Sequence, residues 1–412
     1  MSEEEAYEFV KNTLRDEGIV PYHGQELEVV KSVEQCMNCG LCLNHCPVVR
    51  AVGVDRFSGP RGIAVELSRS PPEYWSTADT IYLCTGCGTC REVCPKNVDI
   101  PSVVILMRAR IFKRRSDLVP KSLLQLSATL TKYGLAFTPW EDEEDKAESR
   151  DARLERHGLP HIEDRIKPGA EVLYYPGCQA EERSQEIREA AKLILDYFGI
   201  DFTLPTEMSC CGLPAKLIGD EETARSLASR LTEQVRSLKV RAVITTCAGC
   251  TSRILEIAEE ENWGVPVYHM VEFLAERVGI DRLGAEFSKG ASEGGITVTV
   301  HDPCHLIRHV SRLVMDSALE ILGAIPDVEL ADSGVADSCC GGGGLVGYHA
   351  ADVSSLVTAR NIEAITRRDP DRVVAPCPLC TSQIENELYR HGSGIEVDDL
   401  TVYIAKHLPL RR

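Results

Sequence analysis

The sequence predicts a multidomain protein in which an N-terminal helical domain precedes two tandem, duplicated α/β domains. Three observations support this prediction. The 412 residues exceed the usual size of one domain, and the 18 cysteines fall into groups of eight, five and five along the chain. The C-terminal half also repeats one pattern of strands, helices and cysteines. We expect the first domain over 1–115, a linker over 116–170, and the two copies over 171–290 and 291–412.

The composition excludes several classes of protein. The chain has 45 basic and 63 acidic residues, a net charge of −18, which argues against a nucleic-acid partner because such proteins carry basic surfaces. Its first residues, MSEEEAYEFVKN, lack the basic start of a signal peptide, and no run of about 18 apolar residues is available to span a membrane. We expect a cytoplasmic chain without a direct membrane span, any membrane association being made through a partner. In that reducing compartment the cysteines are expected to be metal ligands or catalytic thiols.

The first eight cysteines form the pattern C-x2-C-x2-C-x3-C-P twice, at Cys36, Cys39, Cys42 and Cys46 and again at Cys84, Cys87, Cys90 and Cys94. This is the run of bacterial ferredoxins, in which three cysteines hold one cubane 4Fe-4S cluster and the fourth crosses to the other. The pattern assigns Cys36, Cys39, Cys42 and Cys94 to one cluster, and Cys84, Cys87, Cys90 and Cys46 to the second. Zinc is the alternative, but tetrahedral zinc sites usually use two separated pairs of ligands.

The stretch between the two cysteine runs is longer than a minimal two-cluster ferredoxin needs, and 61–69 is compatible with a helix. The domain resembles the helical ferredoxin domain of respiratory iron–sulfur subunits. Clusters with four protein ligands offer no open site, so we expect this domain to pass single electrons. The segment MRARIFKRR (107–115) concentrates five basic residues. It is either a solvated helix face or a docking surface for an acidic electron-transfer partner.

The predicted linker contains a run of charges, EDEEDKAESRD (141–151), which is typical of a solvated linker or an exposed helix surface. We place the domain boundary there. Beyond it, each copy opens with a strand-like segment and a helix that ends at glycine, over 171–199 and 296–323. Strands that alternate with helices predict an α/β domain used twice, with the cysteines at strand ends or in loops.

Each copy contains five cysteines in the order Cys, Cys-Cys-Gly and Cys-x-x-Cys. They are Cys178, Cys210, Cys211, Cys247 and Cys250 in copy one, and Cys304, Cys339, Cys340, Cys377 and Cys380 in copy two. Five thiolates are one more than a cubane accepts, so either one is free to react or the cluster is of another kind. The pattern resembles the CCG domain of the heterodisulfide reductase family. The resemblance implies one noncubane 4Fe-4S cluster in each copy, and a ferredoxin domain fused to two CCG domains resembles a fused subunit of that family.

The resemblance implies reduction of the mixed disulfide of coenzyme M and coenzyme B at the paired noncubane clusters. Electrons would come through the two cubanes from a donor protein, either a membrane cytochrome b or a flavoprotein. The ten CCG cysteines would then be catalytic, and His305 is placed to supply a proton to a departing thiolate. Lys216, Arg308 and His309 either bind the anionic substrate or stabilise the clusters and form ordinary salt bridges.

Proteins with the same outline suggest a second function. The iron–sulfur subunits of glycolate, lactate and glycerol-3-phosphate oxidation also join two ferredoxin motifs to CCG domains, and they relay electrons from a flavoprotein without catalysing the reaction. Those relatives often have degenerate motifs, whereas both motifs are complete here, which favours disulfide reduction. No dinucleotide fingerprint occurs, and the glycines at 341–344 lack the Lys-Ser/Thr of a phosphate loop. Close approach of backbone to a cluster explains them better.

Overall fold

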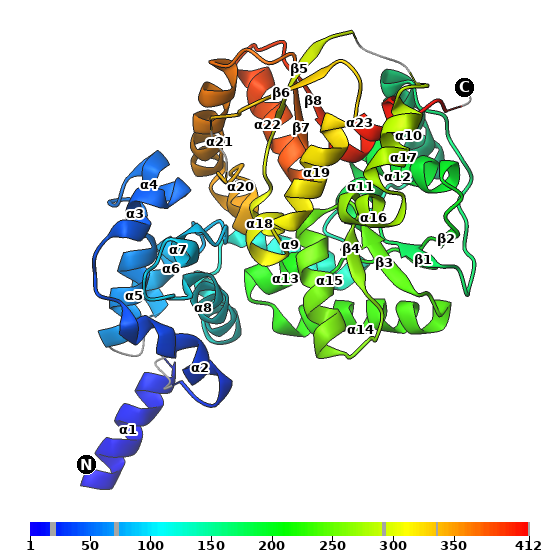
Figure 1. The fold of residues 1–412 in the computed structure, drawn as a ribbon. Coiled ribbons are helices and arrows are strands. Elements are labelled where there is room, and N and C mark those ends of the chain that lie inside the picture. Colours follow the sequence, from blue (N-terminus) through cyan, green and yellow to red (C-terminus); the bar gives the residue numbers. More distant parts are fainter. Residues whose placement is uncertain (17–21, 70–73, 291–293, 335–336, 411–412) are drawn as a thin grey trace. The chain divides into compact units, whose positions relative to one another are not determined.

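The computed structural model describes residues 1–412 except 17–21, 70–73, 291–293, 335–336 and 411–412 (Figure 1). The chain forms two compact units. We call the first the helical unit, which comprises 1–128, 214–224 and 341–357. The second, which we call the sheet unit, comprises 129–213, 225–340 and 358–412.

The helical unit consists of short helices around the two N-terminal cysteine motifs. They include α1 (Glu3–Asp16), α2 (Gln25–Lys31), α3 (Leu41–His45), α4 (Pro47–Val52), α5 (Gly59–Arg69), α6 (Tyr74–Ile81), α7 (Thr89–Glu92) and α8 (Ile100–Arg114), with the 3-10 turns η1 (Ser32–Gln35) and η2 (Ser116–Leu118). Helix α5 covers the segment expected to be helical between the motifs. Most of α13 (Leu213–Ile218), with η3 (Gly343–Leu345) and α20 (Val346–His349), joins the same unit from later in the chain.

Helix α8 illustrates how the sequence specifies these elements. The side chain of Asp99 caps its first turn by accepting a backbone N–H three residues on, and Pro101 lies in that turn, where no intrahelical donor is lost. Val103, Met107 and Ile111 recur every four residues and are buried. The helix therefore presents an apolar stripe to the core of the unit.

The basic segment 107–115 is only in part the exposed surface that the sequence suggested. Arg108 is 1% exposed and Arg110 is 3% exposed, and Arg110 pairs with Glu26 at 3.0 Å. Only the end of the segment, including Lys113 and Arg114, reaches solvent. Arg108 and Arg110 flank the apolar stripe of α8 on its two sides and are both buried. A count of basic residues takes no account of this helical phase.

The sheet unit contains two four-stranded parallel sheets with the same topology, which confirms the predicted duplication. The first has the order β2-β1-β3-β4, made of β1 (Val172–Tyr174), β2 (Phe202–Thr203), β3 (Ala242–Thr245) and β4 (Val267–His269). The second has the order β6-β5-β7-β8, made of β5 (Ile296–Val300), β6 (Val328–Ala331), β7 (Arg372–Ala375) and β8 (Glu396–Asp399). The registers also correspond: Leu173 lies opposite Val243, and Thr299 opposite Val373.

Helices follow the strands in matching order in the two copies. Copy one contains α11 (Gly177–Glu182), α12 (Gln185–Tyr197), α14 (Glu221–Leu238), α15 (Ala248–Glu260), α16 (Met270–Arg277) and α17 (Ile280–Phe287). Copy two contains α18 (Cys304–His309), α19 (Leu313–Gly323), α21 (Ala351–Thr366), α22 (Pro378–Arg390) and α23 (Leu400–Lys406). One apolar core runs through both copies and includes Ile194, Val298 and Tyr403. The copies therefore share a core, and 290/291 is a boundary of the repeat rather than of a compact unit.

The segment expected as a linker over 116–170 is mostly helical. It forms α9 (Lys121–Tyr133) and α10 (Glu143–His157), and the charge run lies on α10. Lys146 pairs with Glu181 of copy one at 2.8 Å, and Arg156 pairs with Glu385 of copy two at 3.2 Å. Since α10 is bound to both copies, it belongs to the sheet unit, and the break between the two units falls at 128/129 instead.

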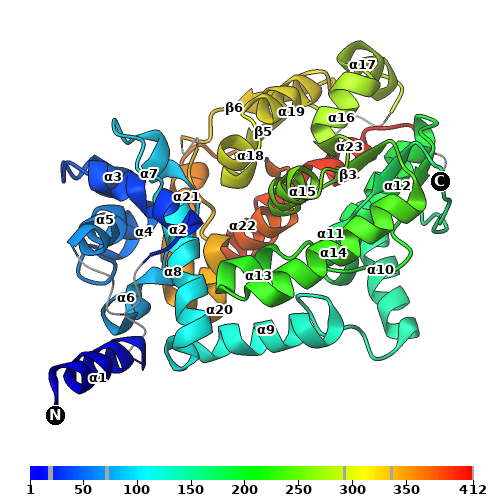
Figure 2. The same ribbon diagram turned by 90° about the horizontal axis from the view of Figure 1, so that it is seen from below.

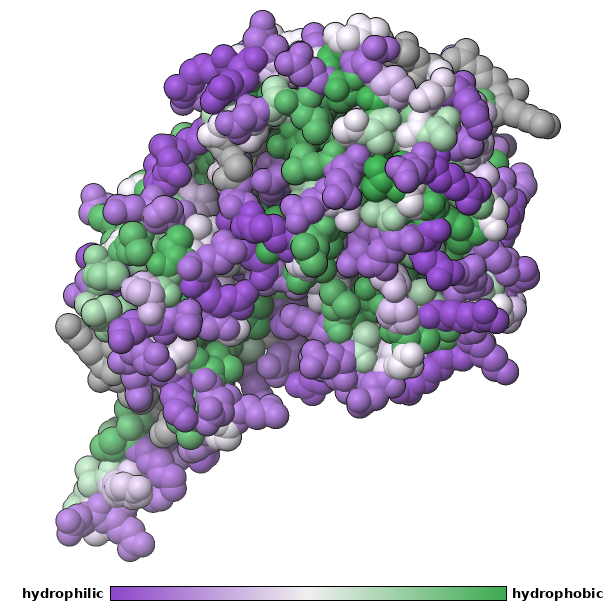
Figure 3. Space-filling model, viewed as in Figure 1, coloured by the Kyte–Doolittle hydropathy of each residue, from purple (hydrophilic) through white to green (hydrophobic). Residues whose placement is uncertain are grey.

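The face shown in Figure 3 is largely hydrophilic, with hydrophobic residues in smaller groups. One such group lies along α1, which buries none of its residues and exposes Tyr7, Phe9 and Val10. Among the residues that the structure describes, no helix has the length and hydropathy needed to cross a bilayer.

Candidate metal centres

The eight N-terminal cysteines surround two cavities in the helical unit. The lining of one includes Cys36, Cys39, Cys42 and Cys94, together with Cys90. The lining of the other includes Cys46, Cys84, Cys87 and Cys90. The structure thus groups the fourth cysteine of each run with the first three of the other run, as the crossed pattern requires.

The local structure explains this crossing. Cys46 is the N-cap of α4, and Pro47 begins the helix, because a proline at that position needs no backbone donor. The start of α4 at this point therefore directs Cys46 away from the first three cysteines of its run.

Without a bound metal, the clustered cysteines of these two sites resist ionisation to thiolates. Burial raises the pKa of Cys46, and the neighbouring Cys87 and Cys84 raise it further. Burial likewise raises the pKa of Cys42, with Cys36 and Cys94 adding to the effect. A cationic metal core relieves such repulsion, so each set of four sulfur donors fits a cubane 4Fe-4S cluster.

The five cysteines of copy one gather at the carboxyl ends of β1 and β3. Cys178 lies on α11, which follows β1, while Cys247 caps α15 and Cys250 lies in its first turn. The sulfurs form a continuous chain of contacts: Cys178 and Cys210 are 3.8 Å apart, Cys211 hydrogen-bonds Cys210 and Cys250, and Cys250 hydrogen-bonds Cys247. All five predicted ligands of copy one therefore line one site.

Gly177 permits the close approach of α11 to this site. Its φ is +78°, and a Cβ added there would lie 2.9 Å from Cys250 Sγ. Only glycine fits this position without displacing a sulfur.

Copy two builds the equivalent site at the ends of β5 and β7. Cys304 begins α18, Cys377 caps α22, and Cys380 hydrogen-bonds both Cys340 and Cys377. The pKa of Cys377 is held well below its usual value by hydrogen bonds from the thiols of Cys247 and Cys380, and by the N–H groups at the start of α22. Cys339 is buried, next to Cys340 in the chain.

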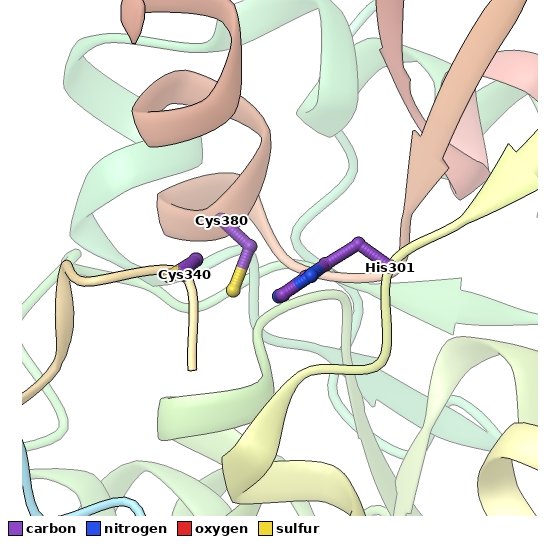
Figure 4. A group of neighbouring side chains, drawn as sticks. All are labelled: His301, Cys340 and Cys380. Carbon is purple, nitrogen blue, oxygen red and sulfur yellow. The ribbon is translucent and has the colours of Figure 1, made fainter. Parts of the chain in front are cut away.

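A histidine that the sequence reading did not single out lies in the copy-two site. His301 is 3% exposed. One of its ring nitrogens and the sulfurs of Cys340 and Cys380 all lie within 4.8 Å of one another. Figure 4 shows the ring directed toward Cys380. Its Nε2 atom has no hydrogen-bond partner among the described residues. The site therefore offers a nitrogen as well as sulfur atoms.

The two five-cysteine sites adjoin within the sheet unit. The thiols of Cys247 from copy one and Cys377 from copy two hydrogen-bond each other. His305 lies at the same junction, with Nδ1 3.7 Å from Cys304 Sγ. Burial lowers the pKa of His305, while the thiolates of Cys377, Cys339 and Cys211 act in the opposite direction. His305 is thus close to sulfurs of both copies.

The predicted substrate-binding cations lie in different places. His309 stacks on His305 with ring centroids 4.8 Å apart. Arg308 is buried and donates a 2.7 Å hydrogen bond to the Asp337 carbonyl, which ties it to the loop before Cys339. Lys216 is half-buried on α13 in the helical unit.

Two further residues beside the sulfurs were missed by the sequence reading. Tyr175 is fully buried next to the copy-one cysteines, and its hydroxyl donates to the Ser209 carbonyl. Arg253 is 4% exposed, lies near Cys211, and pairs with Glu256 at 2.8 Å. Their spacing is the signal that could have found them, since each lies three residues from a cluster cysteine, Tyr175 before Cys178 and Arg253 after Cys250 on the same helix face.

Comparisons with known proteins agree with this architecture. Residues 32–98 match the 4Fe-4S dicluster domain family, and residues 172–254 and 298–385 each match the cysteine-rich domain family. The chain is 26% identical to a subunit of the dihydromethanophenazine:CoB--CoM heterodisulfide reductase of Methanosarcina barkeri, over 92% of this chain and 94% of that protein. It is also 26% identical to a subunit of the fumarate reductase (CoM/CoB) of Methanothermobacter marburgensis, over 92% of this chain and 72% of that protein.

A third relative has a different activity in its name. The chain is 25% identical to a probable glycolate oxidase iron-sulfur subunit of Bacillus subtilis, over 90% of this chain and 94% of that protein. The three relatives are named for three different enzymes, so these comparisons do not point to one substrate. The chain therefore belongs to the proteins that join a 4Fe-4S dicluster domain to two cysteine-rich domains, and these domain families indicate that it carries iron–sulfur clusters.

Proposed function

We propose that the chain is the catalytic subunit of a heterodisulfide reductase and reduces the mixed disulfide of coenzyme M and coenzyme B to two thiols. The observation that carries this proposal is the pair of complete, adjoining five-cysteine sites, which meet at Cys247 and Cys377. A disulfide has two sulfur atoms, and two adjacent metal sites can receive one each. The similarity to the heterodisulfide reductase of Methanosarcina barkeri along most of both chains supports the same function.

The residues that would hold the clusters are the cysteines grouped above. Cys36, Cys39, Cys42 and Cys94 would hold one cubane, and Cys84, Cys87, Cys90 and Cys46 the other, while the five cysteines of each copy would hold one noncubane 4Fe-4S cluster. When bound, the clusters supply single electrons and iron that accepts sulfur. This assignment gives four clusters on one chain.

The overall reaction requires both electrons and protons. Cleaving one S–S bond to two thiols takes two electrons and two protons. His305 is our candidate proton donor, because its ring lies beside Cys304 and close to sulfurs of both copies. His309 stacks on that ring and holds its orientation, and Arg308 fixes the loop that leads to Cys339. We propose that Lys216, Arg308 and His309 also add positive charge for an anionic substrate.

The electrons must come from another protein. The relatives are named as subunits, so we propose a partner subunit as donor, either a membrane cytochrome b or a flavoprotein. We propose that the chain works on the cytoplasmic side and meets a membrane only through that partner.

The decisive experiment is anaerobic purification with the native partners, followed by a viologen-linked assay on the coenzyme M–coenzyme B heterodisulfide. The proposal expects turnover with reduced viologen and about 16 irons per chain, from four clusters of four. The Cys39→Ser and Cys87→Ser variants are the matched controls. They should lose reduction by the natural donor and retain reduction by the small viologen, because the disulfide is reduced in the sheet unit.

The second candidate function is a noncatalytic electron relay for a flavin-dependent dehydrogenase of glycolate, lactate or glycerol 3-phosphate. The observation that favours it is the similarity to the glycolate oxidase iron-sulfur subunit. A copurifying flavoprotein that oxidises a hydroxy acid, together with no heterodisulfide turnover, would establish this function and overturn the first.

A further inference from the structure

Arg108 of α8 makes an unusual set of contacts inside the helical unit. Its guanidinium donates five hydrogen bonds, all to backbone carbonyls: Nε and Nη2 to Ile81 at 3.2 and 2.9 Å, Nη2 to Cys84 at 2.8 Å, and Nη1 to Leu217 and Gly344 at 2.9 and 3.2 Å. The side chain is 1% exposed and also lies over the ring of Tyr82. A buried cation held by neutral acceptors carries its full charge into the core.

The acceptors belong to three segments with different origins. Cys84 is the first ligand of the second cubane motif. Leu217 lies on α13, which follows Cys210-Cys211-Gly212, and Gly344 lies in η3, which follows Cys339-Cys340-Gly341. The same guanidinium therefore binds a cubane loop and the two segments that leave the five-cysteine sites. Figure 2 shows the helices α8, α13 and α20 of these segments next to one another.

The backbone packing at this point leaves no room for side chains. A Cβ added at Gly343 would lie 2.5 Å from the Thr85 carbonyl oxygen, and one at Gly344 would lie 2.8 Å from Thr85 Cα and against the Cys84 carbonyl. A Cβ at Gly219, just after α13, would strike the Arg108 carbonyl. The glycine run approaches the loop of a cluster ligand as closely as backbone can.

The length of the intervening chain limits the distance from the Arg108 contacts to the Cys-Cys-Gly cysteines. Gly344 is four residues from Cys340, so the chain between them spans at most about 14 Å, and the six residues from Cys211 to Leu217 span at most about 21 Å. Electron transfer weakens steeply with distance and with gaps in packing. A contact that fixes these segments against the Cys84 loop is therefore well placed to control it.

We propose that Arg108 is a positioning residue for electron transfer, which clamps the Cys84 loop to both segments that follow the Cys-Cys-Gly motifs and makes the cluster of Cys46, Cys84, Cys87 and Cys90 the exit of the cubane relay. Its positive charge raises the reduction potential of that cluster by stabilising the reduced, more negative form. The inference rests on the cluster assignment of the proposed function, but it does not depend on the identity of the substrate.

The test uses the full chain, reconstituted anaerobically, with Arg108→Met and Arg108→Lys. Arg110→Met and Arg110→Lys are the matched controls, because Arg110 is also buried on α8 but pairs with Glu26. The first measurement is a redox titration followed by electron paramagnetic resonance. Arg108→Met should lower the potential of one cubane, identified as the one whose signal Cys46→Ser removes, while Arg108→Lys keeps most of it because the charge remains.

The second measurement is the rate at which electrons pass from the reduced cubanes to the remaining clusters in a rapid-mixing experiment. We expect a loss of at least about tenfold in both Arg108 variants, because neither lysine nor methionine can bridge four carbonyl groups that lie in different directions. Both Arg110 variants should keep the parent potential and rate. Iron content, measured on each variant, confirms that the clusters have assembled.

An unchanged potential in Arg108→Met, or transfer rates in the Arg108 variants equal to those of the Arg110 variants, would overturn the inference. Should Arg108→Met fail to fold, Arg108→Lys alone decides it through the transfer rate. A chain that lacks heterodisulfide turnover yet shows these shifts would overturn the proposed function and leave the role of Arg108 standing.

Discussion

The two copies in the sheet unit share their fold and their cysteines but differ in the polar residues beside them. Tyr175 and His301 occupy equivalent positions, three residues before the first cysteine, and their backbone N–H groups donate to Ile244 and Val374 of the corresponding strands. The Tyr175 hydroxyl is engaged by the Ser209 carbonyl, whereas His301 presents its ring to Cys340 and Cys380. Duplication has thus preserved the sulfur ligands, and the chemistry around them has diverged.

A second pair shows the same divergence. Arg253 of copy one and Gln383 of copy two each follow the last cysteine by three residues. Arg253 lies near Cys211, whose pKa is held low by hydrogen bonds from Cys210 and Cys250 with a contribution from this cation. Gln383 instead donates to the Thr358 hydroxyl at 2.9 Å. Copy one therefore has a permanent charge beside its sulfurs where copy two has a neutral amide.

The largest effects should come from destroying either sulfur site. Cys211→Ala and Cys340→Ala should each reduce heterodisulfide turnover with an artificial donor by at least about a hundredfold, because one remaining site leaves the second thiolate without a metal partner. Each should also lower the iron content by about four per chain. Viologen-linked rates and iron analysis on the anaerobic protein measure both. Near-normal turnover in one variant would mean that only one copy is catalytic.

A smaller and unequal effect is expected at the diverged position. His301→Phe removes the ring nitrogens that face Cys340 and Cys380, so turnover should fall about tenfold and the Mössbauer spectrum of one noncubane cluster should change, as for one lost hydrogen bond to a charged group. Tyr175→Phe should leave turnover within about twofold and reduce stability by about 1 kcal/mol, since it removes one buried hydrogen bond. Equal losses of turnover in the two variants would contradict a specialised copy two.

Much of this organisation could be predicted from the sequence. The opening strand and helix of each copy follow from apolar periodicity and a glycine stop, and the cysteine spacing assigns the 18 thiols to the two N-terminal runs and the two copies. The short strand β2 was not foreseen, because two residues carry no periodic signal. The division into units also escaped prediction, since residues 214–224 and 341–357 pack with helices that are far away in sequence. Arg108 and His301 were missed because their contacts are made in the folded interior with residues from other segments, and residue type alone does not reveal such contacts.

An exchange of charge tests the second pair. Arg253→Gln gives copy one the amide that copy two already has, and removes a cation from beside Cys211. The reduction potential of the copy-one cluster should fall, and turnover should fall about threefold. This corresponds to less than about 1 kcal/mol, because Glu256 already compensates part of the Arg253 charge. A redox titration of the variant measures the shift. The control is Gln383→Glu, which adds a negative charge at the equivalent place in copy two and should lower the potential of the other cluster.

The smallest effect concerns the outer helices, where the copies also differ. In copy one, Asp164 pairs with Arg188 at 2.5 Å and with Lys192 of α12 at 2.8 Å. The corresponding helix of copy two, α19, has the sequence LVMDSALEILG, which contains no lysine or arginine. Helix α12 therefore holds a carboxylate through its own basic side chains and α19 does not, so the local stability of α12 should respond to acid at this point where that of α19 does not.

The sign of that response follows from the pKa of Asp164. Burial raises it, but the hydrogen bonds and charges of Arg188 and Lys192 prevail and lower it to about 2, from 3.8 in the unfolded chain. A lowered pKa stabilises the folded state above pH 3.8, and the stabilisation disappears as the pH falls from there toward 2. Since the side chain is 49% exposed, solvent screens the pair and Asp164→Asn should cost less than about 1 kcal/mol at neutral pH. Hydrogen exchange of α12 in the Asp164→Asn variant should match the parent chain near pH 2 and exceed it near pH 6, whereas α19 should exchange alike in both. A uniform change across both helices would show that Asp164 acts on the whole sheet unit, because the two copies share one core.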